Sequence, residues 1–431
     1  MSTAMQPQSE RGLTPDQRNA FTAAFLGWTM DAFDYFLVVL VYADIAKDFG
    51  VSLTRMAFLT TATLLMRPIG AFLFGRWADA VGRRRPLMVD VTFYSIVGFA
   101  CAFAPNFTVL LILRLLYGIG MGGEWGLGAA LAMEKVPAER RGFYSGVLQQ
   151  GYACGYLLAA VGYLVLLPLF DDIGVTPWRG LFAFSLLPAL VSLYIRSKVG
   201  ESEAWQRTHE RVVSTKVSAS TVFRQPAILK RFVYLVLLMT AFNWMSHGTQ
   251  DIYSTFLKKG EGFSTHSALY VTIIFNIGAI IGGTLLGTAS QRFGRRRIVM
   301  VAAFLGLFVV PVFSGALGTS FGVLAFGSFV MQFFVQGAWG VIPAHLSEMS
   351  PDEIRGFYPG VTYQLGNCFA AFNLPIQEHL AKTHSYTFAL AWTIVPVFIA
   401  VIILAAVGTE ARHVKFGTEE SSAAERAAAV G

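Results

Sequence analysis

Long apolar segments recur from one end of this chain to the other. A run of about 20 apolar residues can cross the roughly 30 Å hydrocarbon core of a bilayer as a helix. Inside a bilayer the backbone must pair its own polar groups, which a helix does within a single segment. The sequence therefore predicts an all-α membrane protein with twelve transmembrane helices. The twelve runs span approximately residues 21–43, 57–75, 87–104, 107–132, 143–169, 179–196, 232–256, 267–289, 298–316, 321–345, 357–377 and 386–407.

The composition of the 431-residue chain argues against most other classes of protein. Hydrophobic residues make up 55% of the chain and charged residues 14%, and the mean hydropathy of +0.55 is far above that of a soluble globular protein. The three cysteines, Cys101, Cys154 and Cys368, stand in separate apolar runs and offer neither a metal-ligand spacing nor a disulfide framework. The sequence also shows no nucleophile motif or phosphate-binding loop. We therefore expect no enzymatic activity, no metal and no cofactor.

The expected topology of the chain explains its net positive charge. The formal net charge is +7, and the 33 Lys and Arg residues are spread unevenly among the segments between the apolar runs. With a cytoplasmic N-terminus, 25 of them lie on the cytoplasmic side, six lie in outer loops, and Arg67 and Arg114 lie within predicted helices. An excess of cytoplasmic Lys and Arg is the rule for membrane proteins, so both termini are expected in the cytoplasm. The charge therefore needs no nucleic-acid partner to explain it.

Two segments of the first half of the chain recur in the second half. Residues 75–85, GRWADAVGRRR, correspond to residues 287–297, GTASQRFGRRR, 212 positions later. Residues 134–150 correspond to residues 348–364, 214 positions later. Two matches at nearly the same offset indicate a duplication, so we expect two pseudo-symmetric six-helix halves. The predicted organisation is a cytoplasmic N-terminal segment (1–20), an N-terminal half (21–196), a cytoplasmic linker (197–230), a C-terminal half (231–408) and a disordered cytoplasmic tail (409–431).

The first repeated segment carries residues suited to holding helix ends together. Glycines permit close helix approach and a tight turn, and the acid Asp79 can lie at a helix N-terminus or pair with a basic side chain. Gln291 occupies the equivalent position in the second half, which predicts a weaker contact there. In the alternative interpretation, the basic residues of these loops only set the orientation in the membrane. The candidate gating residues are Gly75, Asp79, Gly82 and Arg83 in the first copy, Gly287, Gly294 and Arg295 in the second, and Arg114 within the fourth run.

Acidic side chains lie inside the first apolar run. Ionisable groups within a bilayer are costly, and by default they mark a substrate or proton pathway. Asp31 and Asp34 stand three residues apart, and the repeat offset places Asn243 and Ser246 of the seventh run opposite them. Two nearby carboxylates cannot both stay charged cheaply, so one is suited to carrying a proton. The alternative is a helix cap or a structural ion pair. Tyr35 follows Asp34 and is a candidate for substrate binding.

Arg67 stands alone in the middle of the second apolar run. A guanidinium group cannot shed its proton at this position, so it needs an anionic partner. The partner is either a protein carboxylate, Asp31 or Asp34, or a substrate carboxylate held by two parallel hydrogen bonds. The equivalent position in the second half is Ala279, and an unduplicated charge favours an asymmetric ligand over a structural role. We therefore expect Arg67 to bind substrate.

The seventh apolar run contains a row of polar residues on one helix face. Asn243, His247 and Asp251 are spaced four residues apart, which places them on the same side of a helix. A His–Asp couple can titrate near neutral pH, so His247 and Asp251 are candidates for proton coupling and Asn243 for substrate binding. The alternative is a histidine with a structural hydrogen bond.

Further polar candidates lie in the fourth, fifth and eleventh runs. Glu124 stands in a glycine-rich segment and its counterpart is Ala338, so proton coupling and pairing with Arg114 are both open. Gln150 and Gln364 occupy equivalent positions in the two halves. Their amides can hydrogen-bond a substrate or join helices to each other.

Residues 20–408 resemble the major facilitator superfamily. The loop GRWADAVGRR is similar to the superfamily pattern G-x-x-x-D-x-x-G-R-[RK]. Arg114-x-x-x-Gly118-x-Gly120 is similar to a second superfamily motif, in which a buried Arg is linked to proton coupling; alternatively, Arg114 only ties helices together. The resemblance implies two repeats that rock around a substrate site at the membrane midplane.

Residues 243–255, NWMSHGTQDIYST, resemble a motif of the yeast-type lactate/pyruvate:proton symporters, the monocarboxylate permeases within the sialate:proton symporter family. This resemblance implies proton symport of short monocarboxylates. Arg67 would hold the carboxylate, and His247 and Asp251 would serve coupling and translocation. Asn243 and Gln364 would contribute hydrogen bonds. Segments 28–36, 65–71, 149–157 and 363–367 are similar to the same group.

Two positions depart from the permease pattern. Glu124 is similar instead to the sialate and broader metabolite symporters, and Cys154 stands where the permeases carry a bulkier aromatic side chain. We expect a monomeric, multi-pass transporter of the bacterial inner membrane that imports lactate, pyruvate or a similar acid with a proton as coupling ion. A symporter of larger acids, such as sialic or aromatic acids, is the alternative that Glu124 favours. A non-transporting sensor of organic acids is more remote, because the sequence has no large soluble signalling domain.

Overall fold

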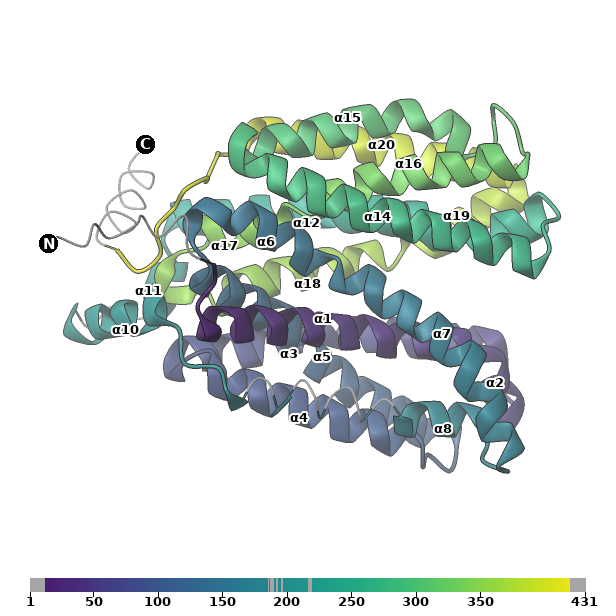
Figure 1. Cartoon of the computed structure of the whole chain (residues 1–431), viewed down its shortest axis with the longest axis horizontal. Coiled ribbons are helices and arrows are strands. Elements are labelled where there is room, and N and C mark those ends of the chain that lie inside the picture. Colours follow the sequence, from purple (N-terminus) through teal and green to yellow (C-terminus); the bar gives the residue numbers. More distant parts are fainter. Residues whose placement is uncertain are drawn as a thin grey trace, which may run out of the picture.

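The computed structural model is a bundle of helices that run along a common direction (Figure 1). It describes residues 12–418 apart from residues 185, 187–189, 191, 192, 195, 196 and 216–218. In those described residues no β-strand occurs, and the prediction of an all-α fold is confirmed. Most helices of the N-terminal half form one layer, and most of those of the C-terminal half form the other.

Each half supplies a similar series of helices. The N-terminal half contains α1 (Pro15–Leu40), α2 (Tyr42–Phe49), α3 (Leu53–Val81), α4 (Arg84–Cys101), α5 (Phe107–Lys135), α6 (Arg141–Gln149), α7 (Gly151–Asp172) and α8 (Pro177–Phe184). The segment between the halves contains α10 (Glu203–Thr215) and α11 (Ala219–Phe223). The C-terminal half contains α12 (Pro226–Gln250), α13 (Tyr253–Thr255), α14 (Thr265–Phe293), α15 (Arg295–Phe313), α16 (Phe321–Trp339), α17 (Ile342–Met349), α18 (Tyr358–Ala370), α19 (Asn373–Thr383) and α20 (Tyr386–Val407).

Short polar residues begin many of the long helices. A Ser, Thr or Asn side chain at the N-cap accepts a hydrogen bond from a backbone N–H that would otherwise lack a partner in the first turn. These residues therefore fix where the chain leaves a loop and enters the membrane. The caps are Thr14 for α1, Ser52 for α3, Asn106 for α5, Ser264 for α14, Ser320 for α16 and Ser385 for α20.

The surface of the bundle is apolar and its interior is partly polar. Within the described residues, eight helical stretches are long and apolar enough to cross a membrane. Large side chains such as Phe58, Phe308 and Trp392 are 58%, 67% and 62% exposed, whereas the charged Asp31 and Arg67 are 1% and 5% exposed. Exposed apolar surface on this scale requires a lipid environment. The protein is therefore a multi-pass membrane protein.

Several predicted boundaries differ from the structure. The run 143–169 is interrupted, because α6 ends at Gln149 and α7 begins at Gly151, and the run 357–377 is interrupted between α18 and α19. The first helix begins at Pro15, inside the predicted N-terminal segment. The run 179–196 includes the end of α8, and part of it falls outside the described residues.

The two halves meet closely near the end of the bundle that holds α10 and α11, which we call the linker end (Figure 1). A Cβ atom added at Gly75 would lie 2.7 Å from Cα of Phe357, and one added at Gly287 would lie 2.6 Å from Cα of Gly146. Glycine is needed at both predicted gating positions, since any side chain would force the crossing helices apart. At the opposite end, the described helices α2, α8, α13 and α19 pack chiefly against helices of their own half.

The residues after α20 differ from the predicted disordered tail. Residues 409–418, which we call the C-terminal strap, run along the linker end, and Phe416 is only 5% exposed. The backbone carbonyl of Val414 accepts a hydrogen bond from Arg141 Nη1 (2.8 Å), and the N–H of Gly417 donates to Asp352 Oδ2 (2.8 Å). The strap is ordered because its aromatic ring and its backbone find partners on the bundle. Residues 1–11 and 419–431 lie outside the described residues.

Candidate functional site

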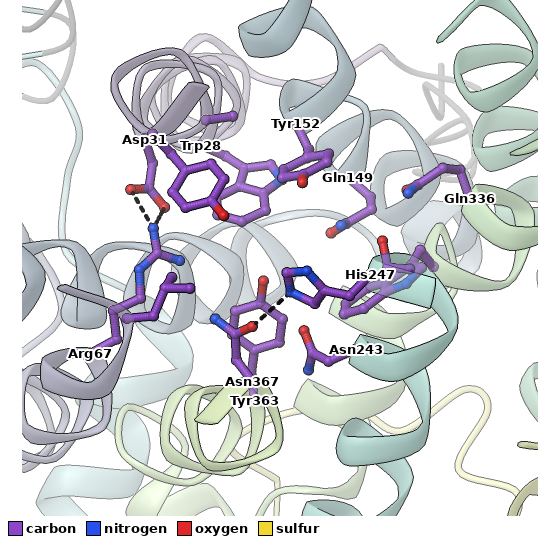
Figure 2. A pocket seen from close by; sticks show the side chains of 15 residues that line it. Trp28, Asp31, Arg67, Gln149, Tyr152, Asn243, His247, Gln336, Tyr363 and Asn367 are labelled. Carbon is purple, nitrogen blue, oxygen red and sulfur yellow. Dashed lines mark hydrogen bonds and ion pairs between the residues drawn. The ribbon is translucent and has the colours of Figure 1, made fainter. Parts of the chain in front are cut away.

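A polar cavity lies between the two halves (Figure 2). It encloses about 520 Å³ of empty space, counting its open part. Five of the predicted site residues line it, namely Asp31, Tyr35, Arg67, Asn243 and His247. The structure thus brings together side chains from α1, α3 and α12 that are far apart in the sequence. The remaining lining residues are Trp28, Ala32, Leu64, Gln149, Tyr152, Ser246, Gln336, Trp339, Tyr363 and Asn367.

Arg67 and Asp31 form a buried ion pair on one side of the cavity (Figure 2). Arg67 Nη2 lies 3.3 Å and 3.5 Å from the two carboxylate oxygens of Asp31 and 3.2 Å from the sulfur of Met121. The buried Nε of Arg67 has no hydrogen-bond partner among the described residues. A guanidinium group has five N–H donors. The Asp31 pair uses one nitrogen, so Arg67 retains donors for a second anion.

His247 links two other polar groups in the C-terminal half. Its Nδ1 lies 3.0 Å and 3.1 Å from the carboxylate oxygens of Asp251, and its Nε2 lies 3.2 Å from Oδ1 of Asn367. A protonated imidazole donates to both groups. A neutral imidazole that donates to Asp251 fits equally well, once the Asn367 amide turns its NH₂ group toward Nε2. The three residues can therefore take up or release a proton with little movement.

The two aspartates of α1 face different partners. Asp31 faces the cavity, whereas Asp34 Oδ2 accepts a hydrogen bond from the hydroxyl of Tyr117 (2.8 Å) and does not line the cavity. The guanidinium of Arg114 lies over the Tyr117 ring, 4.2 Å from its centroid. The predicted pair is therefore divided into a carboxylate at the cavity and a carboxylate in a buried cluster beside it.

Three other predicted residues lie outside the cavity. Glu124 is 1% exposed and is not a lining residue. Gln150 donates from Nε2 to the carbonyl of Gly146 (3.2 Å), and Gln364 is fully buried with no hydrogen-bond partner among the described residues. The neighbouring glutamine, Gln149, lines the cavity instead.

Aromatic residues that the sequence did not single out form part of the cavity wall. Trp28 stacks on Tyr152 with a centroid separation of 5.8 Å, and Trp125 stacks on Tyr363 at 4.3 Å. Trp28 also meets Tyr363 edge-on at 6.4 Å, so the wall joins both halves. Tyr363 and Asn367 stand one helical turn apart, and this spacing is the signal that could have identified them.

The predicted gating loops join the two halves at the linker end. Asp79 accepts hydrogen bonds from the backbone N–H groups of Gly356 (2.7 Å) and Phe357 (3.2 Å), just before α18, and from Arg83 (2.8 Å). In the second half, the neutral amide of Gln291 accepts from one backbone N–H, that of Gly142 (2.9 Å), and donates from Nε2 to the carbonyl of Ala138 (3.0 Å). A charged acceptor with two N–H donors at a helix start is stronger than a neutral acceptor with one. The two loops therefore differ in the charge of the side chain that joins the halves, and a weaker contact at Gln291 stays a prediction.

Symmetry-related ion pairs also join the two halves at the linker end. In each half, the arginine that follows the loop glycine pairs with a glutamate of the same half. That glutamate also contacts an arginine of the other half. Gly82 and Gly294, with φ of 101° and 102°, make the turns that place these arginines. The contacts are Arg83–Glu134 (3.2 Å) and Glu134–Arg355 (3.7 Å) on one side, and Arg295–Glu348 (2.9 Å) and Glu348–Arg141 (3.2 Å) on the other.

The asymmetry between the two loops leads to a prediction. Asp79→Ala should raise the ratio of open to closed linker ends by about tenfold or more, and by more than Gln291→Ala does, because it removes a charged hydrogen bond worth roughly 1.5–3 kcal/mol. Spin labels on cysteines replacing Arg85 and Arg297, both exposed at helix starts near the linker end, would report the distance in a variant without native cysteines. Equal effects of the two substitutions would contradict the proposed asymmetry.

Two repeated helical halves with a polar cavity between them are the architecture of a class of membrane transporters. A family model described as Major Facilitator Superfamily matches residues 23–285, and one described as Sugar (and other) transporter matches residues 227–409. The chain belongs to the major facilitator superfamily. It is a transporter and not an enzyme.

Known relatives transport several kinds of small molecule. A carboxylic acid transporter protein homolog of Saccharomyces cerevisiae is 28% identical over 394 residues, which cover 87% of this chain and 63% of that protein. The chain therefore spans less than two thirds of that relative's length. The sialic acid transporter NanX of Escherichia coli is 28% identical over 371 residues, covering 85% of this chain and 87% of NanX. A gentisate transporter of Corynebacterium glutamicum is 29% identical over 314 residues, covering 70% and 69%.

Among solved structures, the proton:xylose symporter XylE bound to 6-bromo-6-deoxy-D-glucose is similar with a TM-score of 0.76. The match covers 95% of this chain and 99% of XylE at 19% sequence identity. This likeness shows the fold alone.

Proposed function

We propose that this protein is a proton-coupled symporter that imports short monocarboxylates, such as lactate or pyruvate, by alternating access. The observation that carries the proposal is Arg67, a buried cation at the cavity between the halves that pairs through one nitrogen with Asp31. A cation in this position suits a substrate carboxylate. The names of the carboxylic acid and sialic acid transporters support an organic acid and the sialate:proton symporter family.

Asp31 and the substrate carboxylate compete for Arg67, and a proton on Asp31 favours the substrate. When Asp31 binds a proton, its attraction for Arg67 falls, and the guanidinium can bind a substrate carboxylate through two parallel hydrogen bonds. Co-transport of a proton also removes the electrical cost of moving an anion inward, which is about 2.3 kcal/mol per charge per 100 mV. His247 and Asp251, which share a second proton-binding unit, would relay the proton on the C-terminal side.

We place the linker end in the cytoplasm, with both termini, because most Lys and Arg residues lie in segments on that side. The inner membrane of a bacterium is the proposed location, and the protein acts as a monomer. The two halves separate at the linker end to release substrate inward.

A second candidate function is proton symport of larger organic acids, such as sialic or aromatic acids. The aromatic wall of Trp28, Tyr152 and Tyr363 favours this alternative, because rings offer flat apolar surface to a larger or planar acid. The gentisate and sialic acid transporters among the relatives point the same way.

Uptake into proteoliposomes tests both functions. Labelled lactate, pyruvate, sialic acid and benzoate would be offered with and without an inwardly directed proton gradient. We expect accumulation of lactate or pyruvate that depends on the gradient. Accumulation of only the larger acids would support the second candidate. Binding without counterflow would support a sensor and would contradict transport.

A further inference from the structure

The side-chain amide of Gln149 is a buried polar group at the cavity that the proposed mechanism does not use. Gln149 ends α6, is 3% exposed and lines the cavity. Its Oε1 is buried and has no hydrogen-bond partner among the described residues. We propose that the transported acid carries a hydroxyl group and that Gln149 binds this hydroxyl. The inference rests on the proposed function and narrows its substrate class to hydroxy monocarboxylic acids.

A hydroxyl is the group of a small acid that best satisfies this amide. A buried acceptor without a donor is costly, and neither an alkyl chain, a carboxylate nor a keto oxygen can donate to it. A hydroxyl both donates and accepts, so it pairs with the amide in either orientation of its oxygen and nitrogen. An ammonium group also donates, but it would be desolvated in the same cavity as the cation Arg67.

The positions of the polar groups around the cavity agree with a two-point substrate. Arg67 lies on one side of the cavity, and Gln149 lies across it, beyond Trp28 (Figure 2). The indole Nε1 groups of Trp28 and Trp339, which also line the cavity, have no acceptor among the described residues and can donate to a hydroxyl oxygen. The carboxylate and the hydroxyl therefore bind different parts of the cavity wall.

Competition between matched acids tests this inference. Lactate and propionate, 3-hydroxybutyrate and butyrate, and 4-hydroxybenzoate and benzoate would compete against the best labelled substrate in proteoliposomes. In at least one pair we expect the hydroxy acid to compete at a concentration at least about tenfold lower, as in sites built to bind a substrate hydroxyl. Gln149→Met keeps the length of the side chain and should abolish that preference.

Each pair is compared within one protein preparation, so a change in the amount of folded transporter cancels from the ratio. Equal competition within all three pairs for the unchanged protein would overturn the inference, since the amide would then not discriminate hydroxyls. A preference that survives Gln149→Met would overturn the assignment to Gln149. The absence of uptake of every acid would instead contradict the proposed function.

A second inference rests on the C-terminal strap, which is independent of the cavity. The ring of Phe416 lies between two guanidinium groups, 3.8 Å from that of Arg141 and 3.9 Å from that of Arg355. These two arginines occupy equivalent positions in the sequence repeat, one in each half. One aromatic side chain therefore bridges the two halves at the linker end.

Backbone contacts fix the strap on both sides of this bridge. Arg141 donates to the carbonyl of Val414 in the first half, and Gly417 donates to Asp352 in the second half. Arg211 of α10 donates to the carbonyl of Thr418 (3.3 Å), so the linker also holds the strap. We propose that the strap is a conformational latch that stabilises the state with a closed linker end.

The physical basis is a difference in contacts between two states. Opening the linker end must move Arg141 away from Arg355, and Phe416 can then stack on only one of them. A contact that is made in one state and lost in the other shifts the equilibrium toward the first. Cation–π contacts with buried arginines are strong enough to produce such a shift.

Substitutions at Phe416 test the latch. Phe416→Leu keeps apolar bulk but removes the aromatic face, and Phe416→Trp keeps that face. With the spin-label pair at positions 85 and 297, we expect Phe416→Leu to raise the population with an open linker end about fivefold, the lower range of typical coupling between sites. Phe416→Trp should match the unchanged protein. Identical distance distributions for all three proteins would overturn the latch, and unchanged thermal unfolding would confirm that Phe416→Leu remains folded.

Discussion

Arg67→Lys is expected to raise the half-saturation concentration for the transported acid by about 10- to 150-fold. The substitution keeps the positive charge and the attraction to Asp31, but a lysine cannot form two parallel hydrogen bonds with one carboxylate. Loss of one hydrogen bond to a charged group costs roughly 1.5–3 kcal/mol, which corresponds to this range. Concentration-dependent uptake of labelled lactate into proteoliposomes measures the effect.

Arg76→Lys is the matched control for this experiment. Arg76 lies on the same helix, α3, but is exposed, so the same chemical change there should leave the half-saturation concentration unaltered. Normal affinity of Arg67→Lys at normal expression would show that the guanidinium does not hold the carboxylate. The proposed role of Arg67 would then have to be abandoned.

Asp31→Asn is expected to abolish accumulation driven by a proton gradient while exchange of substrate across the membrane continues. A coupled symporter with one proton per substrate gains about tenfold accumulation per pH unit, since one pH unit corresponds to about 1.36 kcal/mol. Asparagine cannot bind that proton, and it leaves Arg67 permanently free for the substrate. Uptake with an imposed pH difference, compared with counterflow without one, separates the two activities.

Gradient-driven accumulation by the Asp34→Asn variant, compared with Asp31→Asn, tests which carboxylate of α1 couples transport to protons. Asp34 bonds to Tyr117 beside the cavity, so it belongs to a different cluster from Asp31. If Asp34→Asn loses gradient-driven accumulation and Asp31→Asn retains it, the coupling site is the Asp34–Tyr117 cluster. That outcome would contradict the proposed competition between Asp31 and the substrate carboxylate for Arg67.

The sequence predicts the architecture and part of the site for different physical reasons. The apolar runs and the repeat at 212 and 214 residues determine the two halves, because both signals span many residues. The sequence could locate Arg67, Asp31 and His247 at the cavity because an ionisable side chain inside an apolar run is costly where it faces lipid.

The side chains that the prediction missed depend on helix phase and on tertiary contacts. The helix is interrupted at Gln150, between α6 and α7. The periodicity of one continuous helix therefore cannot show that Gln149, and not Gln150, lines the cavity. Trp28 and Tyr363 look like ordinary apolar side chains in sequence and become a wall only when the halves pack. The strap was missed because its partners, Arg141 and Arg355, are far away along the chain.

The ion pairs between the two halves at the linker end indicate how the two halves arose. Glu134 contacts Arg355, and the equivalent Glu348 contacts Arg141, so each patch recognises a copy of itself. This reciprocity is the defining property of an isologous dimer interface. A half-length ancestor with these residues could have assembled as a two-fold symmetric pair before its gene was doubled and fused. Some positions now differ between the halves, above all Arg67 and its counterpart Ala279. Binding one asymmetric substrate and moving it in one direction would require such positions to diverge.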